Sequence, residues 1–256
     1  MKLEPRATAA GVRLVVHEVL GSTNAEALRL AREGGHGPLW VTAERQTAGR
    51  GRRGRAWISP AGNLHATLLL TEPAAAEHWP QLSFVAALAA HDAVVEAAAD
   101  LKRLLAIKWP NDLLLAGAKL GGILIEAESG ISAVAIGIGI NCASHPTETD
   151  FSAADLAAAG TSISAAALFS ALSVKMIGRL AQWNAGEGFS TIRADWLARA
   201  AGMGESVRVR LAERELVGQF EALDEAGGLV LRLPDGSART IAAGDVFMSA
   251  PPGKVI

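Results

Sequence analysis

The chain has 256 residues, half of them hydrophobic, a formal net charge of −2 and a single cysteine, Cys142. The length allows one large domain or a main domain with a small second one. The near-neutral charge argues against a general nucleic-acid binder, and one cysteine excludes an intramolecular disulfide. The sequence has no signal peptide and no apolar run of the ~18 residues that a membrane span needs. We therefore expect a soluble, cytoplasmic protein.

Apolar periodicity predicts strands alternating with helices through the first two hundred residues. The expected strands cover residues 12–19, 39–43, 63–71, 104–108, 112–115, 119–128 and 132–140. The expected helices cover residues 25–33, 80–99, 152–159, 164–184 and 189–200. This pattern predicts an α+β fold in which helices flank a mixed β-sheet.

The texture changes after Gly202-Met203-Gly204, which we interpret as a domain boundary. Five short strands are expected beyond it, at residues 207–211, 217–223, 229–233, 239–241 and 246–249. So many short strands in so few residues indicate a small β-barrel. The predicted organisation is a main domain over residues 1–201 and a C-terminal barrel domain over residues 202–256.

Between residues 44 and 62 the periodicity collapses into a long polar loop. Its centre, Gly49–Arg55, alternates glycines with arginines at positions 50, 52, 53 and 55. Glycines let backbone N–H groups approach an anion, and arginines bind phosphate or carboxylate in a bidentate manner. Composition alone equally allows a solvated basic loop that contacts RNA. The spacing does not match a Walker A loop, and no strand and helix flank it as in a dinucleotide fingerprint.

Two further segments place a cation beside a strand. In Lys108-Trp109-Pro110-Asn111-Asp112 a cation, an aromatic ring, an amide and a carboxylate lie between two strands; taken alone, a turn with Trp109 packed in the core explains it. Lys119 begins an apolar strand in which Gly121 and Gly122 leave side-chain space. A lysine there either neutralises a phosphate or oxyanion or is a solvated strand end.

The last two segments are Gly137-Ile138-Gly139-Ile140-Asn141, whose alternate glycines clear one face of a buried strand, and Ser22-Thr23-Asn24. The latter begins a helix and offers N–H groups and hydroxyls, although simple helix capping also explains it. The six histidines have no zinc spacing, and we expect Cys142 to be a passive buried residue.

Together and in this order, the motifs resemble the biotin protein ligase family. The matching segments are Ser22–Asn24, Gln46–Trp57, Asn63-Leu64, Lys108–Asp112, Lys119–Glu126 and Gly137–Asn141. The resemblance implies a class II synthetase-like catalytic domain followed by a small SH3-like β-barrel. It also implies a two-step reaction, in which ATP and biotin form biotinyl-5′-adenylate and the acyl group then passes to a lysine. The implied acceptor is the biotin carboxyl carrier protein of acetyl-CoA carboxylase or another biotin-dependent carboxylase. Mg²⁺ is expected to accompany ATP, and no resident metal site is expected.

Carried over position by position, the resemblance assigns roles to the motif residues. The implied catalytic residues are Lys119, Arg50 and Arg52. Those implied to bind biotin are Ser22, Thr23, Asn24, Gln46, Arg50, Gly51, Arg52 and Lys119. Those implied to bind ATP or the adenylate are Arg52, Trp57, Asn63, Lys119 and Asn141. Those implied to shape the site are Lys108, Trp109, Asn111, Asp112, Gly121 and Gly122, and Asp112 is also implied to influence transfer to the acceptor.

Three alternatives stay open: a lipoate or octanoyl ligase of the same architecture, an RNA-binding module that uses the basic loop, and a biotin sensor without transfer activity. Some family members carry an N-terminal DNA-binding domain. Only about ten residues precede the first expected strand, so we expect no specific DNA binding. The sequence allows either a monomer or a homodimer. We further expect the Gly49–Arg55 loop to be a mobile lid that becomes ordered when biotin and the adenylate bind.

Overall fold

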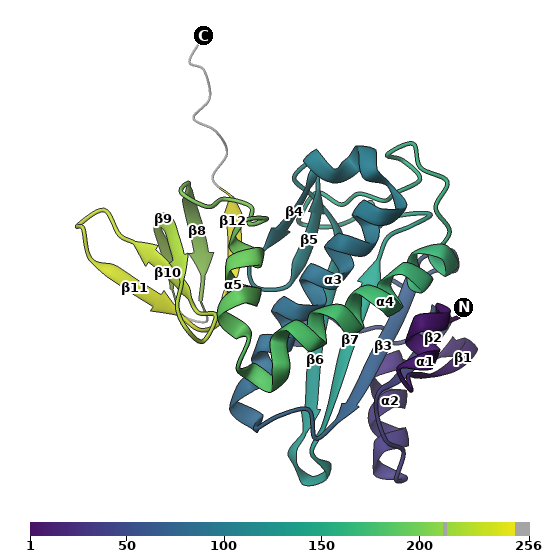
Figure 1. The fold of residues 1–256 in the computed structure, drawn as a ribbon. Coiled ribbons are helices and arrows are strands. Elements are labelled where there is room, and N and C mark those ends of the chain that lie inside the picture. The colour runs from purple at the N-terminus through teal and green to yellow at the C-terminus, as the bar shows by residue number, and fades with distance from the viewer. Residues whose placement is uncertain (212–213, 249–256) are drawn as a thin grey trace.

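The computed structural model describes residues 1–211 and 214–248 and contains two β-sheets (Figure 1). The strands of the larger sheet are β1 (Arg13–Leu20), β2 (Leu39–Gln46), β3 (Leu64–Thr71), β4 (Leu105–Lys108), β5 (Asp112–Leu115), β6 (Ala118–Glu128) and β7 (Ala133–Ile140). They lie in the order β1-β2-β3-β7-β6-β5-β4. The pair β1–β2 is parallel and the other pairs are antiparallel, so the predicted mixed sheet is confirmed.

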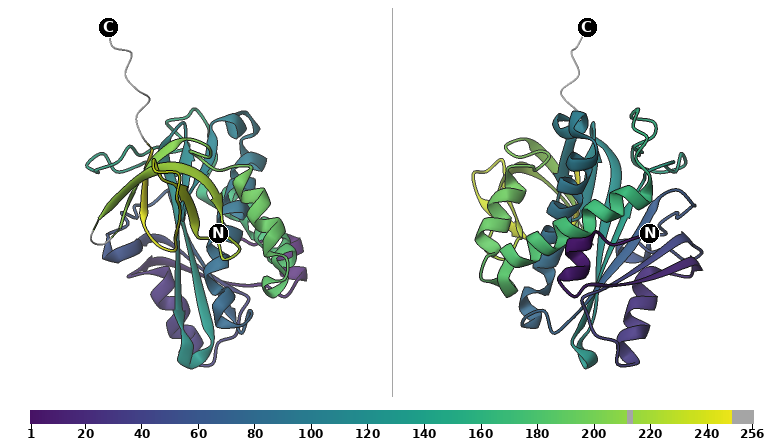
Figure 2. Two further views of the ribbon diagram at one scale, coloured as in Figure 1. Left: turned by 90° about the vertical axis from the view of Figure 1, so that its left-hand side faces the viewer. Right: turned by 45° about the vertical axis from the view of Figure 1, so that its right-hand side comes forward.

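Helices cover both faces of this sheet (Figures 1 and 2). The helices are α1 (Pro5–Ala9), α2 (Thr23–Arg32), α3 (Leu82–Ala97), α4 (Ala165–Trp183) and α5 (Phe189–Leu197). Helices α3 and α4 bury one face in the main core, where Trp40 of β2 packs edge-on against Phe169 of α4 at 5.4 Å. Helix α2 covers part of the other face with Ala27, Leu28 and Ala31. The rest of that face, beyond the N-terminus of α2, is available for a site.

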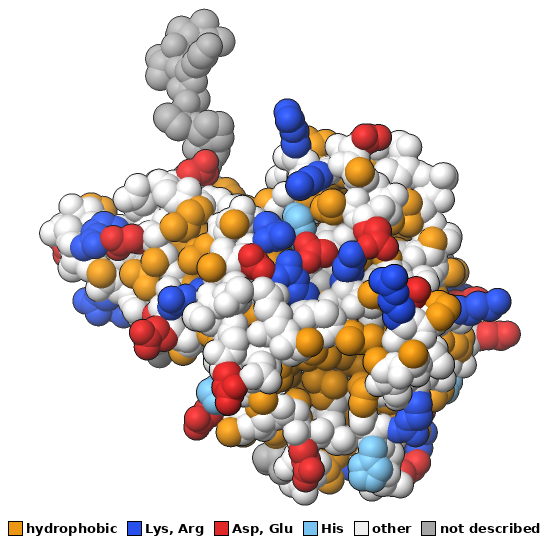
Figure 3. All heavy atoms as spheres, in the orientation of Figure 1, with side chains coloured by type: hydrophobic (Ala, Val, Ile, Leu, Met, Phe, Trp, Pro, Cys, Tyr) orange, Lys and Arg blue, Asp and Glu red, His pale blue; other side chains and the backbone are white. Residues whose placement is uncertain are grey.

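Short 3₁₀ turns join several of these elements. They are η1 (Arg52–Gly54), η2 (Ala76–Gln81), η3 (Ala99–Arg103), η4 (Ser129–Ile131) and η5 (Asn184–Gly186). Because η1 lies within the Gly49–Arg55 loop, called the arginine loop from here on, that loop has defined local structure. On the sheet face that α3 and α4 cover, charged side chains gather over these helices (Figure 3). Ion pairs of Arg179 with Asp92 and Asp195 join α4 to α3 and α5.

The C-terminal strands are β8 (Ser206–Arg210), β9 (Glu215–Leu223), β10 (Leu229–Arg232), β11 (Ala238–Ile241) and β12 (Asp245–Met248). They form an antiparallel sheet in the order β11-β10-β9-β8-β12, with a register shift at Val230 and Leu231. The sheet lies beside the β4 edge of the larger sheet (Figure 1). Trp109 ties the two sheets together by donating its indole N–H to the carbonyl of Gly227 at 3.0 Å.

The prediction of a helix over residues 152–159 is wrong. Ala153 forms an isolated bridge with Lys119, and turns occupy residues 156–160. The amide of Lys119 donates to the carbonyl of Ser152 at 2.8 Å, and the amide of Ala154 donates to the carbonyl of Lys119 at 2.9 Å. Pairing with β6 therefore overrides the helix propensity of this alanine-rich segment.

Smaller differences concern one short helix and the ends of two strands. The short helix α1 was not expected, and β2 runs on to Gln46 instead of ending at residue 43 because it stays paired with β1 up to Leu20. The last expected strand begins at Asp245, and its final residue, Ser249, lies outside the described residues. Within the described part of the chain, no helix is both long and apolar enough to cross a membrane.

Candidate active site

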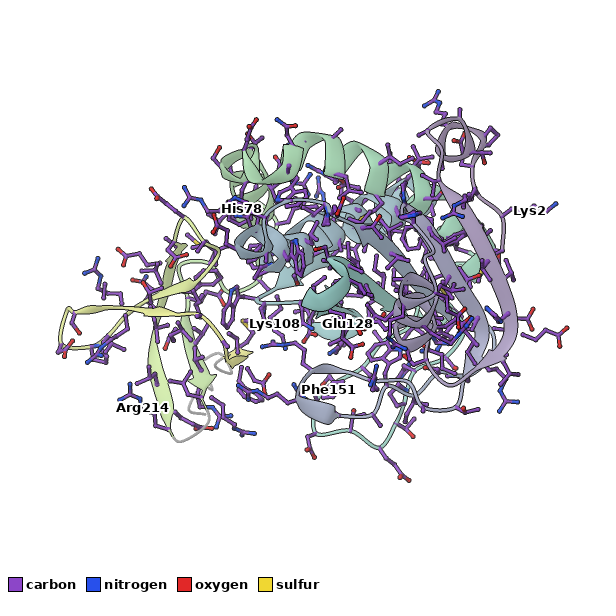
Figure 4. The ribbon with its side chains drawn as sticks, turned by 90° about the horizontal axis from the view of Figure 1, so that it is seen from below. Lys2, His78, Lys108, Glu128, Phe151 and Arg214 are labelled. Atoms are coloured by element: carbon purple, nitrogen blue, oxygen red, sulfur yellow. The ribbon has the colours of Figure 1, made fainter. Side chains whose placement is uncertain are left out.

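A pocket of about 380 Å³ lies on the sheet face beyond the N-terminus of α2. Its walls come from that helix end, strands β6 and β7, the arginine loop, the segment after β7 and the first residues of β12. Figure 4 labels two residues of this lining: Lys108, which lies between the two sheets, and Phe151, which follows β7. Segments distant in the sequence therefore meet at one cavity.

One end of the pocket is polar. Ser22 caps α2 by accepting a hydrogen bond from the amide of Ala25 at 3.5 Å, and Thr23 follows it. Both the amide and the hydroxyl of Thr23 donate to Oε1 of Gln46, at 2.8 and 3.0 Å. Nε2 of Gln46 donates to Ser59 at 2.9 Å, which fixes the orientation of its amide. Strand β2 pairs with β1 as far as Gln46, which lies opposite Leu20. Because α2 begins three residues after Leu20, this pairing brings Gln46 next to Thr23. This end holds hydroxyls and amides in fixed positions, as a small polar ring requires.

Asn24 lines the same end but is held inside the protein. Its Nδ2 donates to the carbonyl of Leu124 at 3.3 Å and to Glu126 at 2.8 Å. Its Oδ1 accepts from the hydroxyl of Thr67 at 2.6 Å. The side chain of Asn24 therefore joins α2 to strands β3 and β6, which lie under the pocket.

The alternate glycines of β7 clear the sheet, as predicted, but the protein's own side chains use much of the space. A Cβ atom at Gly137 would clash with Oδ1 of Asn24, and one at Gly139 would lie 2.6 Å from Nε1 of Trp57. These glycines therefore let Asn24 and Trp57 pack directly against the backbone of β7. Gly122 of β6 lies at the pocket surface, whereas a Cβ at Gly121 would lie 2.7 Å from the carbonyl oxygen of Gly139. Gly121 thus serves strand packing and does not line the pocket.

The centre of the pocket holds a buried carboxylate between two lysines. Oδ1 of Asp112 lies 2.6 Å from Nζ of Lys119, and its Oδ2 lies 3.0 Å from Nζ of Lys108. Burial alone raises the pKa of the Asp112 carboxyl, but the charges and hydrogen bonds of Lys119 and Lys108 outweigh burial and hold this pKa below its ordinary value. Asp112 is therefore ionised and fixes two ammonium groups at the pocket, leaving one net positive charge for an anionic ligand.

Aromatic rings flank Lys119. Its Nζ lies 5.6 Å from the ring centroid of Trp57 and 5.4 Å from that of Phe151, both within cation–π distance. Asn141 lines the pocket beside them and donates from Nδ2 to the carbonyl of Ala154 at 3.0 Å. Trp57 and Asn141, two of the residues implied for the nucleotide, therefore lie on the side of the cavity that is next to the central Lys119 and opposite the polar end.

Asn63, also implied for the nucleotide, lies behind the pocket. Its Oδ1 accepts hydrogen bonds from the amides of Cys142, Ala143 and Ser144 at 2.9, 2.9 and 3.2 Å. Its Nδ2 donates to the carbonyl of Ser144 at 2.8 Å. Both polar atoms of the Asn63 side chain are hydrogen-bonded to the turn after β7. Asn63 therefore supports the shape of the site and is not part of the pocket lining.

The arginine loop crosses the pocket and is held at both ends by carboxylates. Arg50 pairs with Glu126 of β6 at 3.1 Å, and Arg53 and Arg55 pair with Asp245 of β12 at 3.1 and 3.0 Å. Between them, Arg52 turns inward, and burial lowers the pKa of its guanidinium, although an arginine stays charged at neutral pH. The loop arginines are thus distributed between internal ion pairs and the pocket.

Arg52 is positioned by Asn111 and by the second sheet. It donates to Oδ1 of Asn111 at 3.3 Å and to the carbonyl of Gly244 at 3.4 Å. Asn111 in turn donates to the carbonyl of Ile123 at 2.6 Å. Asn111 therefore links the loop to the sheet that carries Lys119.

Most of the predicted site residues meet at this pocket, and some lining residues were not predicted. Among the predicted ones, the lining includes Ser22, Thr23, Asn24, Gln46, Arg50, Gly51, Arg52, Trp57, Lys108, Trp109, Asn111, Asp112, Lys119, Gly122 and Asn141. Phe151, Asp245 and Phe247 also line it and were missed. The sequence signal for Asp245 was weak, because its basic partners lie about 190 residues away.

Cys142 is buried beside the pocket, and burial raises the pKa of its thiol to about 11. A thiol with this pKa is almost entirely protonated at neutral pH and is a poor nucleophile. The expectation of a passive buried cysteine agrees with this environment.

The fold and this pocket define a protein ligase of the biotin and lipoate type. Residues 16–142 match the model of the biotin/lipoate A/B protein ligase family, and residues 202–249 match that of the biotin protein ligase C-terminal domain. The chain superimposes on a biotin protein ligase from Aquifex aeolicus, solved in complex with biotin and ATP, with a TM-score of 0.80 and 25% identity. That superposition covers 93% of this chain and 99% of the Aquifex chain.

Curated relatives narrow the class. The chain is 44% identical to a biotin–[acetyl-CoA-carboxylase] ligase of Paracoccus denitrificans, over 88% of this chain and 96% of that protein. It is 34% identical to the ligase of the same description from Mycobacterium tuberculosis, over 88% and 85% of the two chains. The chain therefore belongs to the biotin protein ligase family.

Proposed function

We propose that this protein activates biotin with ATP and transfers the biotinyl group to a lysine of a biotin carboxyl carrier protein. The observation that carries the proposal is the position of Lys119. Its ammonium lies between a polar pocket end, suited to the ureido ring of biotin, and an aromatic end beside Trp57 and Phe151, suited to a nucleotide. A single cation there can contact both the carboxylate and the α-phosphate that must react.

In the first step a carboxylate oxygen of biotin attacks the α-phosphorus of ATP, and pyrophosphate leaves. The two anionic substrates repel each other, so the protein must supply positive charge where they meet. Lys119 supplies it at the centre, and Arg52 supplies it from the loop. Asp112 keeps the lysine ammonium groups in place without neutralising both of them.

In the second step the ε-amine of the acceptor lysine attacks the acyl carbon, and AMP leaves. The acceptor must approach the pocket mouth, where Ile58 and Phe151 are exposed. The amine has to lose a proton before or during attack, and we assign that proton to solvent and not to Asp112, the buried carboxylate of the pocket. Its lowered pKa suits it better to positioning a cation than to accepting that proton.

We treat Mg²⁺ as part of the nucleotide substrate. Residues 1–211 and 214–248 contain no group of three or more histidine, cysteine or acidic side chains able to hold a metal ion. We propose that the ion arrives on the ATP phosphates, where it offsets their charge. We propose the cytoplasm as the location, since ATP and carboxylase carrier proteins are found there.

The competing functions have less support. A cysteine-dependent acyl transferase needs a thiolate, whereas burial raises the pKa of Cys142. An RNA contact needs exposed, unneutralised cations, whereas Arg50, Arg53 and Arg55 pair with carboxylates of the protein itself.

Pyrophosphate exchange into ATP tests the choice of substrate. Purified protein would be assayed with biotin, lipoate or octanoate as the only carboxylic acid. We expect exchange that depends on biotin. Exchange with lipoate and none with biotin would reject the proposal.

A further inference from the structure

The segment that follows β7, residues 143–155, forms one wall of the pocket. Its lining residues are Pro146, Glu148, Thr149, Phe151 and Ala153. Apart from the single bridge at Ala153, the segment has no helix or strand to support it. Individual side-chain and backbone contacts must therefore set its shape.

The two ends of this wall are anchored to the sheet. Asn63 binds the amides at its start, and the backbone of Lys119 binds Ser152 and Ala154 near its end. These contacts hold residues 143–144 and 152–154 and leave the stretch between them, which ends at Phe151, without a backbone anchor of this kind.

A side-chain contact between His145 and Asp155 joins the two ends of this wall. Nδ1 of His145 lies 2.5 Å from Oδ2 of Asp155, ten residues further along the chain. The other oxygen, Oδ1, accepts a hydrogen bond from the amide of Ala158 at 2.6 Å. Only 5% of Asp155 is exposed, so this carboxylate depends on its protein partners. Because a carboxylate only accepts, Nδ1 of His145 carries the shared hydrogen.

This wall lies at the end of the pocket that we assign to the nucleotide. Phe151 lies beside the Lys119 ammonium, and Asn141 donates to the carbonyl of Ala154, next to Asp155. At the biotin end, by contrast, Gln46 is held by Ser59 and accepts from the amide and the hydroxyl of Thr23. The two ends of the pocket are thus held by separate sets of contacts.

We propose that the His145–Asp155 pair is a positioning clasp for the ATP site. It acts through the wall: by holding residues 146–154 in one conformation, it places Phe151 and Pro146 for the nucleotide before ATP binds. This inference rests on the proposed function, because it assigns the wall to ATP. It predicts that losing the clasp weakens ATP binding while leaving biotin binding intact.

The test is the KM for each substrate in pyrophosphate exchange by the full chain. His145→Ala should raise the KM for ATP about tenfold, the factor expected for loss of a hydrogen bond to a charged partner, and leave the KM for biotin unchanged. Asp155→Ala should do the same. His145→Asn should restore most of the ATP affinity, since the Asn amide can donate from nearly the same position as Nδ1. His78→Ala is the matched control, because His78 also lies beside a carboxylate, that of Glu77, but outside the pocket lining.

The outcomes separate this inference from the function on which it rests. Equal rises in the KM for biotin and ATP would show a general loss of structure and overturn the clasp. An unchanged KM for ATP in both alanine variants would overturn it as well. If the unaltered protein shows no exchange with biotin, the proposed function fails and the clasp with it; exchange with normal KM values in the variants rejects the clasp alone.

Discussion

Asp112→Asn removes the negative charge that lies between Lys108 and Lys119 while keeping the size of the side chain. In the native protein the carboxylate is buried and lies 3.0 and 2.6 Å from the two ammonium nitrogens. The amide leaves two lysines facing each other without a counter-charge. The substitution should therefore destabilise the fold and also disturb the site.

The magnitude follows from the burial of the three groups. Removing one partner of a fully buried ion pair costs roughly 3–5 kcal/mol of unfolding free energy. Here the lysine side chains are 22% and 21% exposed, so water screens part of the loss, and we expect about 2 kcal/mol. In a protein of this size that corresponds to a fall in Tm of about 4–8 °C.

The pKa of Asp112 gives this prediction a pH dependence. A carboxyl whose pKa is lowered by folding stabilises the native state above its unfolded pKa of about 3.9, and that stability is lost as the pH falls through the folded pKa. The difference between the native protein and Asp112→Asn should therefore be constant from neutral pH down to about pH 5 and shrink only below about pH 4.

Urea denaturation at several pH values measures this difference directly. The control is Asp100→Asn, an exposed acidic residue of η3, which should change the stability little. A difference that vanishes between pH 7 and pH 5 would mean that folding raises the pKa of Asp112, and the assigned ion-pair geometry would be refuted.

The remaining predictions concern catalysis and the loop. Lys119→Ala should lower the exchange rate about 10²–10³-fold, the loss typical of a transition-state charge donor, while Asp112 keeps its other lysine and circular dichroism stays native; native turnover would remove this lysine from the mechanism. Arg52→Gly should release the adenylate early, seen as faster loss of bound radiolabelled adenylate on a gel-filtration column, and equal retention would contradict its role. Cys142→Ala should keep full exchange activity, whereas abolished activity would revive a thiol mechanism. Trypsin should cut residues 49–57 more slowly when biotin and ATP are present, and equal rates would reject the lid hypothesis.

The sequence could predict the main sheet because its signals are local. Each strand has its own apolar pattern, and the alternate glycines of β7 predict that one face of this strand lacks side chains. The segment 152–159 shows the limit of such reasoning. Its alanines favour a helix, but its backbone pairs with Lys119, more than thirty residues earlier, and local sequence does not contain that partner.

The same limit applies to the site. The motifs that line the pocket lie on strands and turns whose order is set by the sheet, so they converge as predicted. Asp245 could not be assigned, because its function depends on how the second sheet meets the arginine loop. Asn63 was assigned to the nucleotide, yet its side-chain amide is hydrogen-bonded to the turn after β7. This geometry depends on the fold and has no signal in the local sequence.

The most direct test of the central claim is the mass of an acceptor after reaction. A purified biotin carboxyl carrier domain would be incubated with this protein, biotin, ATP and Mg²⁺, and analysed by mass spectrometry. We predict the addition of one biotinyl group on a single lysine, dependent on ATP and strongly slowed by Lys119→Ala. An unmodified carrier, or modification that does not need ATP, would contradict the account.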